Sequence, residues 1–265
     1  MSIVDERAFY HAPVMLQECL DALNIKADGT YADCTLGGGG HSYAIANKLT
    51  SSGALHAFDR DEEAVAYATK RLAGVAPKFI VHPVRFGELK NEIPADTLAA
   101  ALRKNADMDR AFKLATRLVE MAADIKRQDR AILPNDVKSV VESVFPDKRR
   151  EVNGLLARVF QAIRMEVNGE LKEIEDSLRA AVDCLKVGGR LVVMSYHSVE
   201  DRCVKETAAE FEKACICPEN LPVCMCGGNH QKLRKVNRKP ILPTGEEIAK
   251  NSRARSAKLR VYERV

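Results

Sequence analysis

The chain has 265 residues, of which 46% are hydrophobic and 29% charged, and its formal net charge is +4. This length can bury a full hydrophobic core, and the composition is that of a globular protein rather than a disordered or fibrous one. No apolar run approaches the roughly 20 residues of a membrane span, and residues 1–11 lack the apolar core of a signal peptide. We therefore expect a cytoplasmic protein that is not associated with a membrane.

The positive charge is concentrated near the C-terminus. Residues 231–265 contain eleven Lys and Arg against three Glu, a net charge of +8, which leaves −4 for residues 1–230. A basic segment attached to a mildly acidic body favours binding of a polyanion such as RNA, although a solvated charged surface has the same composition.

The N-terminal third contains a glycine-rich turn between two predicted strands. An amphipathic helix is predicted over 16–23, and a short strand over 31–36 leads into four consecutive glycines and a helix over 41–49. Glycines at such a turn let the backbone approach a ligand, with the helix N–H groups directed at it. A second strand over 54–58 ends at Asp59, twenty residues after Gly39, where an acidic side chain typically holds ribose hydroxyls. This order predicts a nucleoside-cofactor site.

The spacing of the glycines narrows the choice of cofactor. The dinucleotide fingerprint requires a sixth-position glycine, which is replaced here by Ser42 or Tyr43, and no Gly-Lys-Ser/Thr of a P-loop follows. Asp33, Gly37 and Gly39 fit Asp-x-x-x-Gly-x-Gly, which is similar to the first motif of S-adenosylmethionine-dependent methyltransferases. A glycine-rich turn in another α/β enzyme remains the alternative.

The middle of the chain differs from the part before it. A helix over 62–72 and a strand over 79–82 complete a β-α-β-α-β half-sheet of the doubly wound α/β class. Residues 94–145 are helical in pattern and contain no strand candidate, which predicts an inserted helical subdomain. The expected organisation is residues 1–86 and 154–265 as the two halves of one α/β domain, with the insertion at 87–153.

The C-terminal half contributes a second group of candidate residues. A long helix over 155–185 ends before Gly-Gly, and the apolar run 190–196 predicts a buried central strand. His197, Ser198 and Asp201 follow at its carboxyl end, where open α/β sheets bind ligands. Helix capping by Ser198 with Asp201 is the alternative role for these two residues. A closing strand is predicted over 258–263.

Four of the eight cysteines are clustered as Cys215-Ile-Cys217 and Cys224-Met-Cys226. In an intracellular protein such a cluster indicates a metal before a disulfide, but Cys-x-Cys is tighter than the usual Cys-x-x-Cys of zinc sites. We therefore expect reduced thiols and predict no metal ligand.

Several blocks of the sequence together resemble one family, the bacterial small-subunit ribosomal RNA cytidine methyltransferases of the RsmH (MraW) type. The matching blocks occur in the same order along the chain as in the family: residues 11–16, 31–42, 58–61, 158–171, 196–202, 238–241 and 251–260. The cysteine-bearing segment also resembles a loop found in many members. The resemblance implies a class I methyltransferase fold, Rossmann-like and doubly wound, with an inserted helical subdomain.

One departure from the family pattern concerns the sheet. The family follows its third strand with a fourth strand ending in Asp-Leu-Gly-x-Ser-Ser, an aromatic loop and a Leu-Asp-Met-Arg-Met segment, and none of these is present. Phe86 runs directly into Gly-Glu-Leu-Lys-Asn, which resembles a piece found well downstream in the family. Either the protein has lost these elements, including residues that contact the cofactor in the family, or about fifty residues are absent from the sequence as given.

The resemblance also implies an activity and a cofactor site. The activity is transfer of a methyl group from S-adenosyl-L-methionine to the exocyclic amine of a cytidine in the decoding region of small-subunit ribosomal RNA. Gly37, with Gly39, Gly40 and His41, would line the methionine end of the cofactor. Asp59 would hold its ribose, and Phe86 would lie against the adenine. His41 as an ordinary residue of a helix N-terminus, and Phe86 as a core aromatic, are the alternatives.

The substrate side of the site is predicted from the chemistry of the target amine, which needs a hydrogen-bond acceptor for its protons. The polar cluster at the end of the strand offers such acceptors, with His197 or Asp201 the first choice among Ser195, His197, Ser198, Glu200 and Asp201. The basic C-terminal segment would hold RNA phosphates, especially through Arg253, Arg255, Lys258 and Arg260. The partner would be the small-subunit ribosomal RNA or the small ribosomal subunit, with a homodimer as a further option. A methyltransferase for another substrate and a catalytically impaired RNA-binding relative remain as alternatives.

Overall fold

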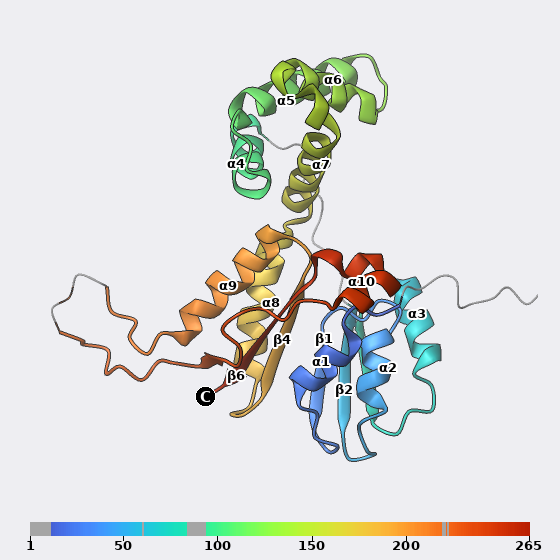
Figure 1. Cartoon of the computed structure of the whole chain (residues 1–265), viewed down its shortest axis with the longest axis vertical. Coiled ribbons are helices and arrows are strands. Elements are labelled where there is room, and N and C mark those ends of the chain that lie inside the picture. The colour runs from blue at the N-terminus through green and yellow to red at the C-terminus, as the bar shows by residue number, and fades with distance from the viewer. Residues whose placement is uncertain (1–11, 60, 84–93, 219–220, 222) are drawn as a thin grey trace, which may run out of the picture. The chain divides into compact units, whose positions relative to one another are not determined.

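The computed structural model describes residues 12–59, 61–83, 94–218, 221 and 223–265. The chain divides into two compact units, one formed by residues 1–87 with 175–265 and the other by residues 88–174. Figure 1 labels the elements of both. Within the described residues, no helix is long and apolar enough to cross a membrane.

The larger unit contains a parallel sheet built as the sequence predicts. Strands β1 (Thr30–Asp33), β2 (Ala54–Asp59) and β3 (Lys78–Pro83) pair in that order, and helices α2 (Gly40–Ala46) and α3 (Glu62–Arg71) connect them. The inward side chains of α2, β2 and the end of α3 form a shared core that includes Ile45, Leu55 and Leu72. The side chain of Asp61 caps α3 by accepting the N–H groups of Glu63 and Ala64. The predicted half-sheet is confirmed.

A second, antiparallel sheet completes this unit. Strand β6 (Lys258–Arg264) lies between β4 (Arg190–Ser195) and β5 (Leu233–Lys235). Helix α8 (Glu170–Cys184) precedes β4, and α9 (Ser198–Glu212) follows it (Figure 1). The predicted closing strand at 258–263 is confirmed as β6.

The prediction that β4 is a buried central strand was wrong. In the described part of the chain β4 pairs only with β6, and its residues from Arg190 to Met194 are half-buried. On the parallel sheet, β1 likewise pairs only with β2. The apolar sequence of β4 could pair with a neighbour on each side, but among the described residues it has a neighbour on one side.

Helix α1 (Leu16–Leu23) links the two sheets by packing with both cores. Leu20 belongs to the core of the parallel sheet. Cys19 and Ala22, on the other side of the helix, pack in a cluster with Leu259 and Val261 of β6. The helix is fixed from a second direction by α10 (Gly245–Lys250), whose Glu247 accepts the N–H of Met15 at 3.1 Å. Hydrophobic burial on two faces therefore holds together sheets that share no strand.

The smaller unit is helical, as expected, and consists of elements that surround one apolar core. These are α4 (Ala95–Ala106), α5 (Ala111–Arg127), α6 (Pro134–Val144), the 3-10 turn η2 (Pro146–Glu151) and α7 (Val152–Asn168). Leu155, Val159 and Ala162 of α7 are buried in this core. The unit therefore extends to residue 174 rather than ending at 153. The single helix predicted over 155–185 is two helices, because Gly169 adopts a left-handed conformation (φ 62°) that ends α7.

Candidate cofactor and substrate site

The glycine-rich turn adopts a conformation that requires glycine at two positions. Gly37 and Gly39 have φ values of +47° and +70°, which L-residues with side chains rarely adopt. A Cβ atom on Gly39 would lie 3.1 Å from Ala68 Cβ of α3, so this glycine also permits close packing of the turn on the helix. A Cβ atom on Gly37 would meet no described atom within 4 Å, so the turn presents open backbone there.

The structure brings Asp59 and the glycine turn together, as the sequence predicts. The Oδ2 atom of Asp59 accepts the N–H of Gly37 at 2.7 Å, and Oδ1 accepts the N–H of Asp61 at 3.0 Å. The N–H of Leu36 donates to the carbonyl of Phe58 at 3.0 Å, which aligns the ends of the two strands. A carboxylate and a glycine turn at the carboxyl ends of adjacent parallel strands therefore form one hydrogen-bonded unit.

Asp33 joins β1 to the start of α2. Its Oδ2 accepts the hydroxyl of the fully buried Ser42 at 2.7 Å, and its Oδ1 accepts the N–H of Thr35 at 3.0 Å. Asp33 was predicted as part of the glycine motif, and its contacts with Ser42 and Thr35 were not predicted. The position of Asp33, four residues before Gly37, was the feature of the sequence that could have indicated these contacts.

His41 and Gly40 are held by the segment that precedes α1. The Nε2 atom of His41 lies 3.0 Å from the carbonyl oxygen of Val14, and a Cβ atom on Gly40 would approach Pro13 at 3.2 Å. This segment therefore covers the start of α2, and His41 has a structural partner in addition to its predicted cofactor role. Phe86 lies outside the described residues.

His197 and Glu200 cap the helix that follows β4. The Nδ1 atom of His197 accepts the N–H of Glu200 at 3.4 Å, and Glu200 Oε2 accepts the N–H of Tyr196 at 2.8 Å. Burial raises the pKa of Glu200, but hydrogen bonds from His197 and from backbone N–H groups outweigh it and leave this pKa below its usual value. The alternative capping pair, Ser198 with Asp201, was wrong because the cap residue is His197. Ser198 is exposed on the first turn of α9.

Two residues predicted to contact substrate instead contact each other. Arg260 of β6 and Asp201 of α9 form a bidentate ion pair at 2.7 and 3.0 Å, and both side chains are only 13% exposed. The Arg260 guanidinium lowers the pKa of Asp201, and Asp201 in turn raises the pKa of Arg260. Each side chain is therefore engaged in joining α9 to β6, and the roles of Asp201 as a hydrogen-bond acceptor and of Arg260 as a phosphate ligand stay predictions.

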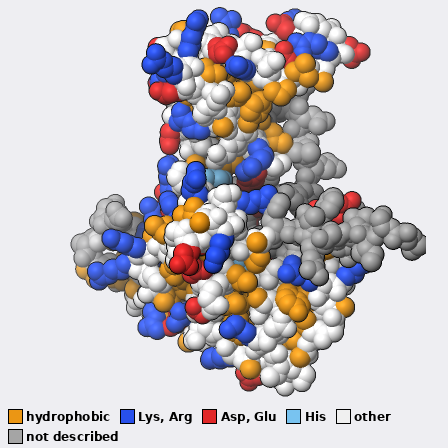
Figure 2. All heavy atoms as spheres, turned by 45° about the vertical axis from the view of Figure 1, so that its right-hand side comes forward, with side chains coloured by type: hydrophobic (Ala, Val, Ile, Leu, Met, Phe, Trp, Pro, Cys, Tyr) orange, Lys and Arg blue, Asp and Glu red, His pale blue; other side chains and the backbone are white. Residues whose placement is uncertain are grey.

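The other basic residues are more accessible. Arg253 and Arg255 are exposed on the 3-10 turn η3 (Ser252–Ser256), and Lys258 lies 3.7 Å from Asp201. Burial raises the pKa of Tyr196, and the positive charge of Arg253 opposes this shift, which places that charge near the end of β4. Figure 2 shows further Lys and Arg side chains on the visible faces of both units.

A family model described as the MraW methylase family matches residues 8–100 and 87–265. Proteins named "Ribosomal RNA small subunit methyltransferase H" are similar over nearly the whole chain. The one from Paenibacillus sp. is 35% identical over 316 positions, covering 97% of this chain and 100% of the relative. Those from Clostridioides difficile and Fusobacterium nucleatum are 33% and 31% identical, with 97% of this chain covered and 99% and 97% of the relatives.

These comparisons also show where the relatives have additional residues. The alignments run over 310 to 316 positions, which exceeds the 265 residues of the chain, so each relative has several dozen residues without a counterpart here. The two segments matched by the family model overlap at residues 87–100, shortly after β3.

A solved structure of a SAM-dependent O-methyltransferase from Thermotoga maritima is similar over 98% of this chain and 69% of its own chain, at 11% identity and a TM-score of 0.45. At that level the likeness does not bear on function.

The family match includes both the glycine turn with Asp59 and the capped end of β4. A turn of open backbone beside a carboxylate at the ends of parallel strands is the arrangement that holds the nucleoside part of S-adenosylmethionine in Rossmann-like methylases. The chain belongs to the MraW methylase family.

Proposed function

We propose that this chain transfers a methyl group from S-adenosylmethionine to the exocyclic amine of a cytidine in small-subunit ribosomal RNA. The observation that carries the proposal is the hydrogen-bonded unit of Gly37 and Asp59, in a chain whose relatives are named as methyltransferases of that RNA. The names of the relatives give the RNA, and the choice of the cytidine amine follows from the resemblance to the family.

The residues at the glycine turn fit the cofactor. The left-handed conformation of Gly37 leaves backbone exposed for close approach of a ligand, and Asp59 provides a carboxylate that accepts hydroxyl hydrogen bonds. When bound, S-adenosylmethionine supplies an electrophilic methyl group on a sulfonium. We assign Gly39, Gly40 and His41 to the same site because they form the start of α2 directly after Gly37.

The residues after β4 are assigned to the target base. A cytosine amine is a weak nucleophile, so alignment and removal of water supply much of the rate. The exposed Ser198 is the acceptor that we assign to the amine protons. His197, whose Nδ1 and Nε2 atoms both contact Glu200, and Asp201, which is paired with Arg260, are assigned positioning roles. A cytosine in structured RNA has to be turned out of its stack to reach such a site.

The basic 3-10 turn is assigned to the RNA backbone. Arg253 and Arg255 are exposed, and the N–H of Arg253 donates to the side chain of Asn251, which fixes the start of the turn. Neutralising phosphates with such side chains gives salt-dependent binding. The comparisons do not favour a purely RNA-binding relative, because the family match includes the glycine turn. A homodimer and a cytoplasmic location remain predictions.

The proposal is tested by cofactor binding and by methyl transfer measured on the same preparation. Calorimetric titration with S-adenosylmethionine is expected to give binding that is lost in Asp59→Asn and retained in Asp28→Asn, which changes an exposed carboxylate outside the turn. Circular dichroism verifies that both variants are folded. Radiolabelled methyl transfer to small ribosomal subunits, followed by nuclease mapping, identifies the modified nucleotide.

The outcomes separate the alternatives. Binding of the cofactor with methylation of a cytidine amine supports the proposal in full. Cofactor binding without transfer to ribosomal RNA would indicate a methyltransferase for another substrate. Salt-dependent RNA binding by a folded protein that does not bind the cofactor would overturn the enzyme assignment. That result is physically reasonable for a unit in which β1 of one sheet and β4 of the other each have a single strand partner among the described residues.

A further inference from the structure

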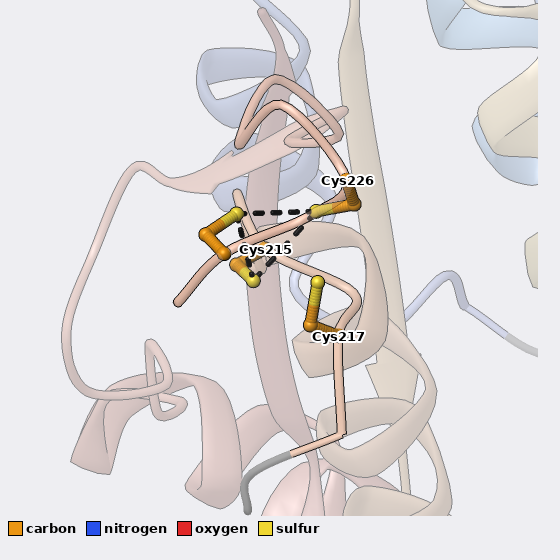
Figure 3. A group of neighbouring side chains, drawn as sticks. Cys215, Cys217 and Cys226 are labelled. Carbon is orange, nitrogen blue, oxygen red and sulfur yellow. Dashed lines mark hydrogen bonds between the residues drawn. The ribbon is translucent and has the colours of Figure 1, made fainter. Parts of the chain in front are cut away.

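Four cysteine side chains meet in the segment between α9 and β5, away from the residues assigned to methyl transfer. The Sγ atoms of Cys215, Cys217, Cys224 and Cys226 all lie within 4.8 Å of one another. Figure 3 shows these side chains converging from two separate stretches of the segment. Each stretch contributes a Cys-x-Cys pair, so the chain has to fold back on itself to bring the pairs together.

The distances between the sulfur atoms fit the edges of a coordination tetrahedron. Three of the six are 3.5 Å from Cys215 to Cys224, 3.6 Å from Cys224 to Cys226 and 3.7 Å from Cys226 to Cys215, and the three to Cys217 are within 4.8 Å. A tetrahedral site with Zn–S bonds of about 2.3 Å has S···S edges of about 3.8 Å. A disulfide would require about 2.05 Å. All four thiols are free, and their spacing corresponds to a shared central ion.

Backbone N–H groups in the segment donate to sulfur across the two pairs. The N–H of Ile216 donates to Cys226 Sγ at 3.5 Å, and the N–H of Met225 donates to Cys217 Sγ at 3.3 Å. In each case the donor lies between the two cysteines of one pair and the acceptor belongs to the other. Such hydrogen bonds stabilise the thiolate, which is the form that binds metal.

The segment has little else to fold it. Its base is closed by the N–H of His230 on the carbonyl of Ala214 at 3.0 Å. Its apolar side chains face solvent: Ile216, Val223 and Met225 are 61%, 71% and 82% exposed. A loop that buries no apolar surface of its own gains its fixed shape from cross-links, and a structural metal is one such cross-link.

We propose that these four cysteines form a structural zinc site. The site is closed, since all four tetrahedral positions are taken by thiolates, so the ion has no open position for substrate. The ion fixes the turn that leads from α9 into β5. Iron is the other ion that suits four thiolates in this geometry, and the test distinguishes it from zinc. This inference is independent of the proposed methyl transfer, and it revises the expectation of unligated thiols.

Metal analysis of the full-length protein, purified under reducing conditions, tests the site directly. Inductively coupled plasma mass spectrometry is expected to find about one zinc per chain in the wild type and less than about a tenth of that in Cys217→Ser. Cys184→Ser, which removes an exposed cysteine outside the cluster, is expected to retain the zinc. Cys217→His is expected to retain it as well, because imidazole is an equivalent ligand.

A second measurement covers the case in which the serine variant does not fold. The wild-type protein is stripped of metal with a chelator and titrated with Co²⁺, and tetrahedral thiolate absorption bands are expected at one equivalent. Hydrogen exchange of residues 213–232 is expected to slow when zinc is restored. Iron in place of zinc, zinc that survives Cys217→Ser, or two disulfides found by intact mass in the protein before any reductant is added would each overturn the proposal.

Discussion

Disruption of the ion pair between Asp201 and Arg260 distinguishes a structural role for these residues from a role in substrate contact. The pair is bidentate, and both side chains are only 13% exposed, so solvent screens it weakly. Removing one partner leaves the other charged and mostly buried. We take the lower end of the range for buried pairs, about 3 kcal/mol, as the loss for Asp201→Asn or Arg260→Gln.

A double-mutant cycle in urea, followed by circular dichroism, measures this loss. Because the two changes act on one interaction, the double variant is expected to lose about 2 kcal/mol less than the sum of the single variants. For a chain of this size, a single variant is expected to melt roughly 6 to 10 °C lower. The residual methyl-transfer activity of each variant, measured well below its melting temperature, is expected to fall together with local order at α9.

The salt dependence of RNA binding can refute the structural role of Arg260. If Arg260 contacts a phosphate, Arg260→Gln reduces the slope of log RNA affinity against log salt concentration by about one. We expect an unchanged slope because the guanidinium is occupied by Asp201. Additive stabilities in the cycle together with a reduced slope would refute the structural role and restore the predicted phosphate contact.

Three further predictions follow from the same geometry. Gly39→Ala is expected to destabilise the protein by about 2 kcal/mol in urea, because its φ is +70° and a Cβ would crowd α3, whereas Gly154→Ala, in open space on α7, is expected to be neutral or stabilising. Replacing both Arg253 and Arg255 by Gln is expected to lower the salt slope of RNA binding by about two, and an unchanged slope would exclude them as phosphate ligands. The pKa of Asp201 is lowered in the folded protein, so its carboxylate stabilises the fold above the unfolded pKa of about 3.9, and this stabilisation is lost as the pH falls through the folded pKa. The free energy of unfolding of Asp201→Asn, measured over the same acid range, is expected to lack this decrease.

Local sequence was sufficient to predict the first half-sheet and the glycine turn. Strand, glycine turn, helix and acid follow one another within 29 residues, from Tyr31 to Asp59, so short-range rules of backbone conformation determine them. The contact between Gly37 and Asp59 could be predicted because parallel strands joined by one helix bring their carboxyl ends together. The helical character of the middle segment followed from its periodicity for the same reason.

The tertiary structure decided what depends on partners distant in the chain. The apolar run of β4 reads as a central strand, but a strand is central only if two others reach it, and only β6 does so in the described residues. Asp201 and Arg260 are 59 residues apart and each reads as an exposed functional group until the pairing of β6 with β4 brings them together. The same holds for the four cysteines: their spacing argued against a metal site, and the fold-back of the segment brings their four sulfur atoms within 4.8 Å of one another. Composition and periodicity describe what a residue can do next to its neighbours in sequence, whereas burial and ion pairing depend on which distant surface covers it.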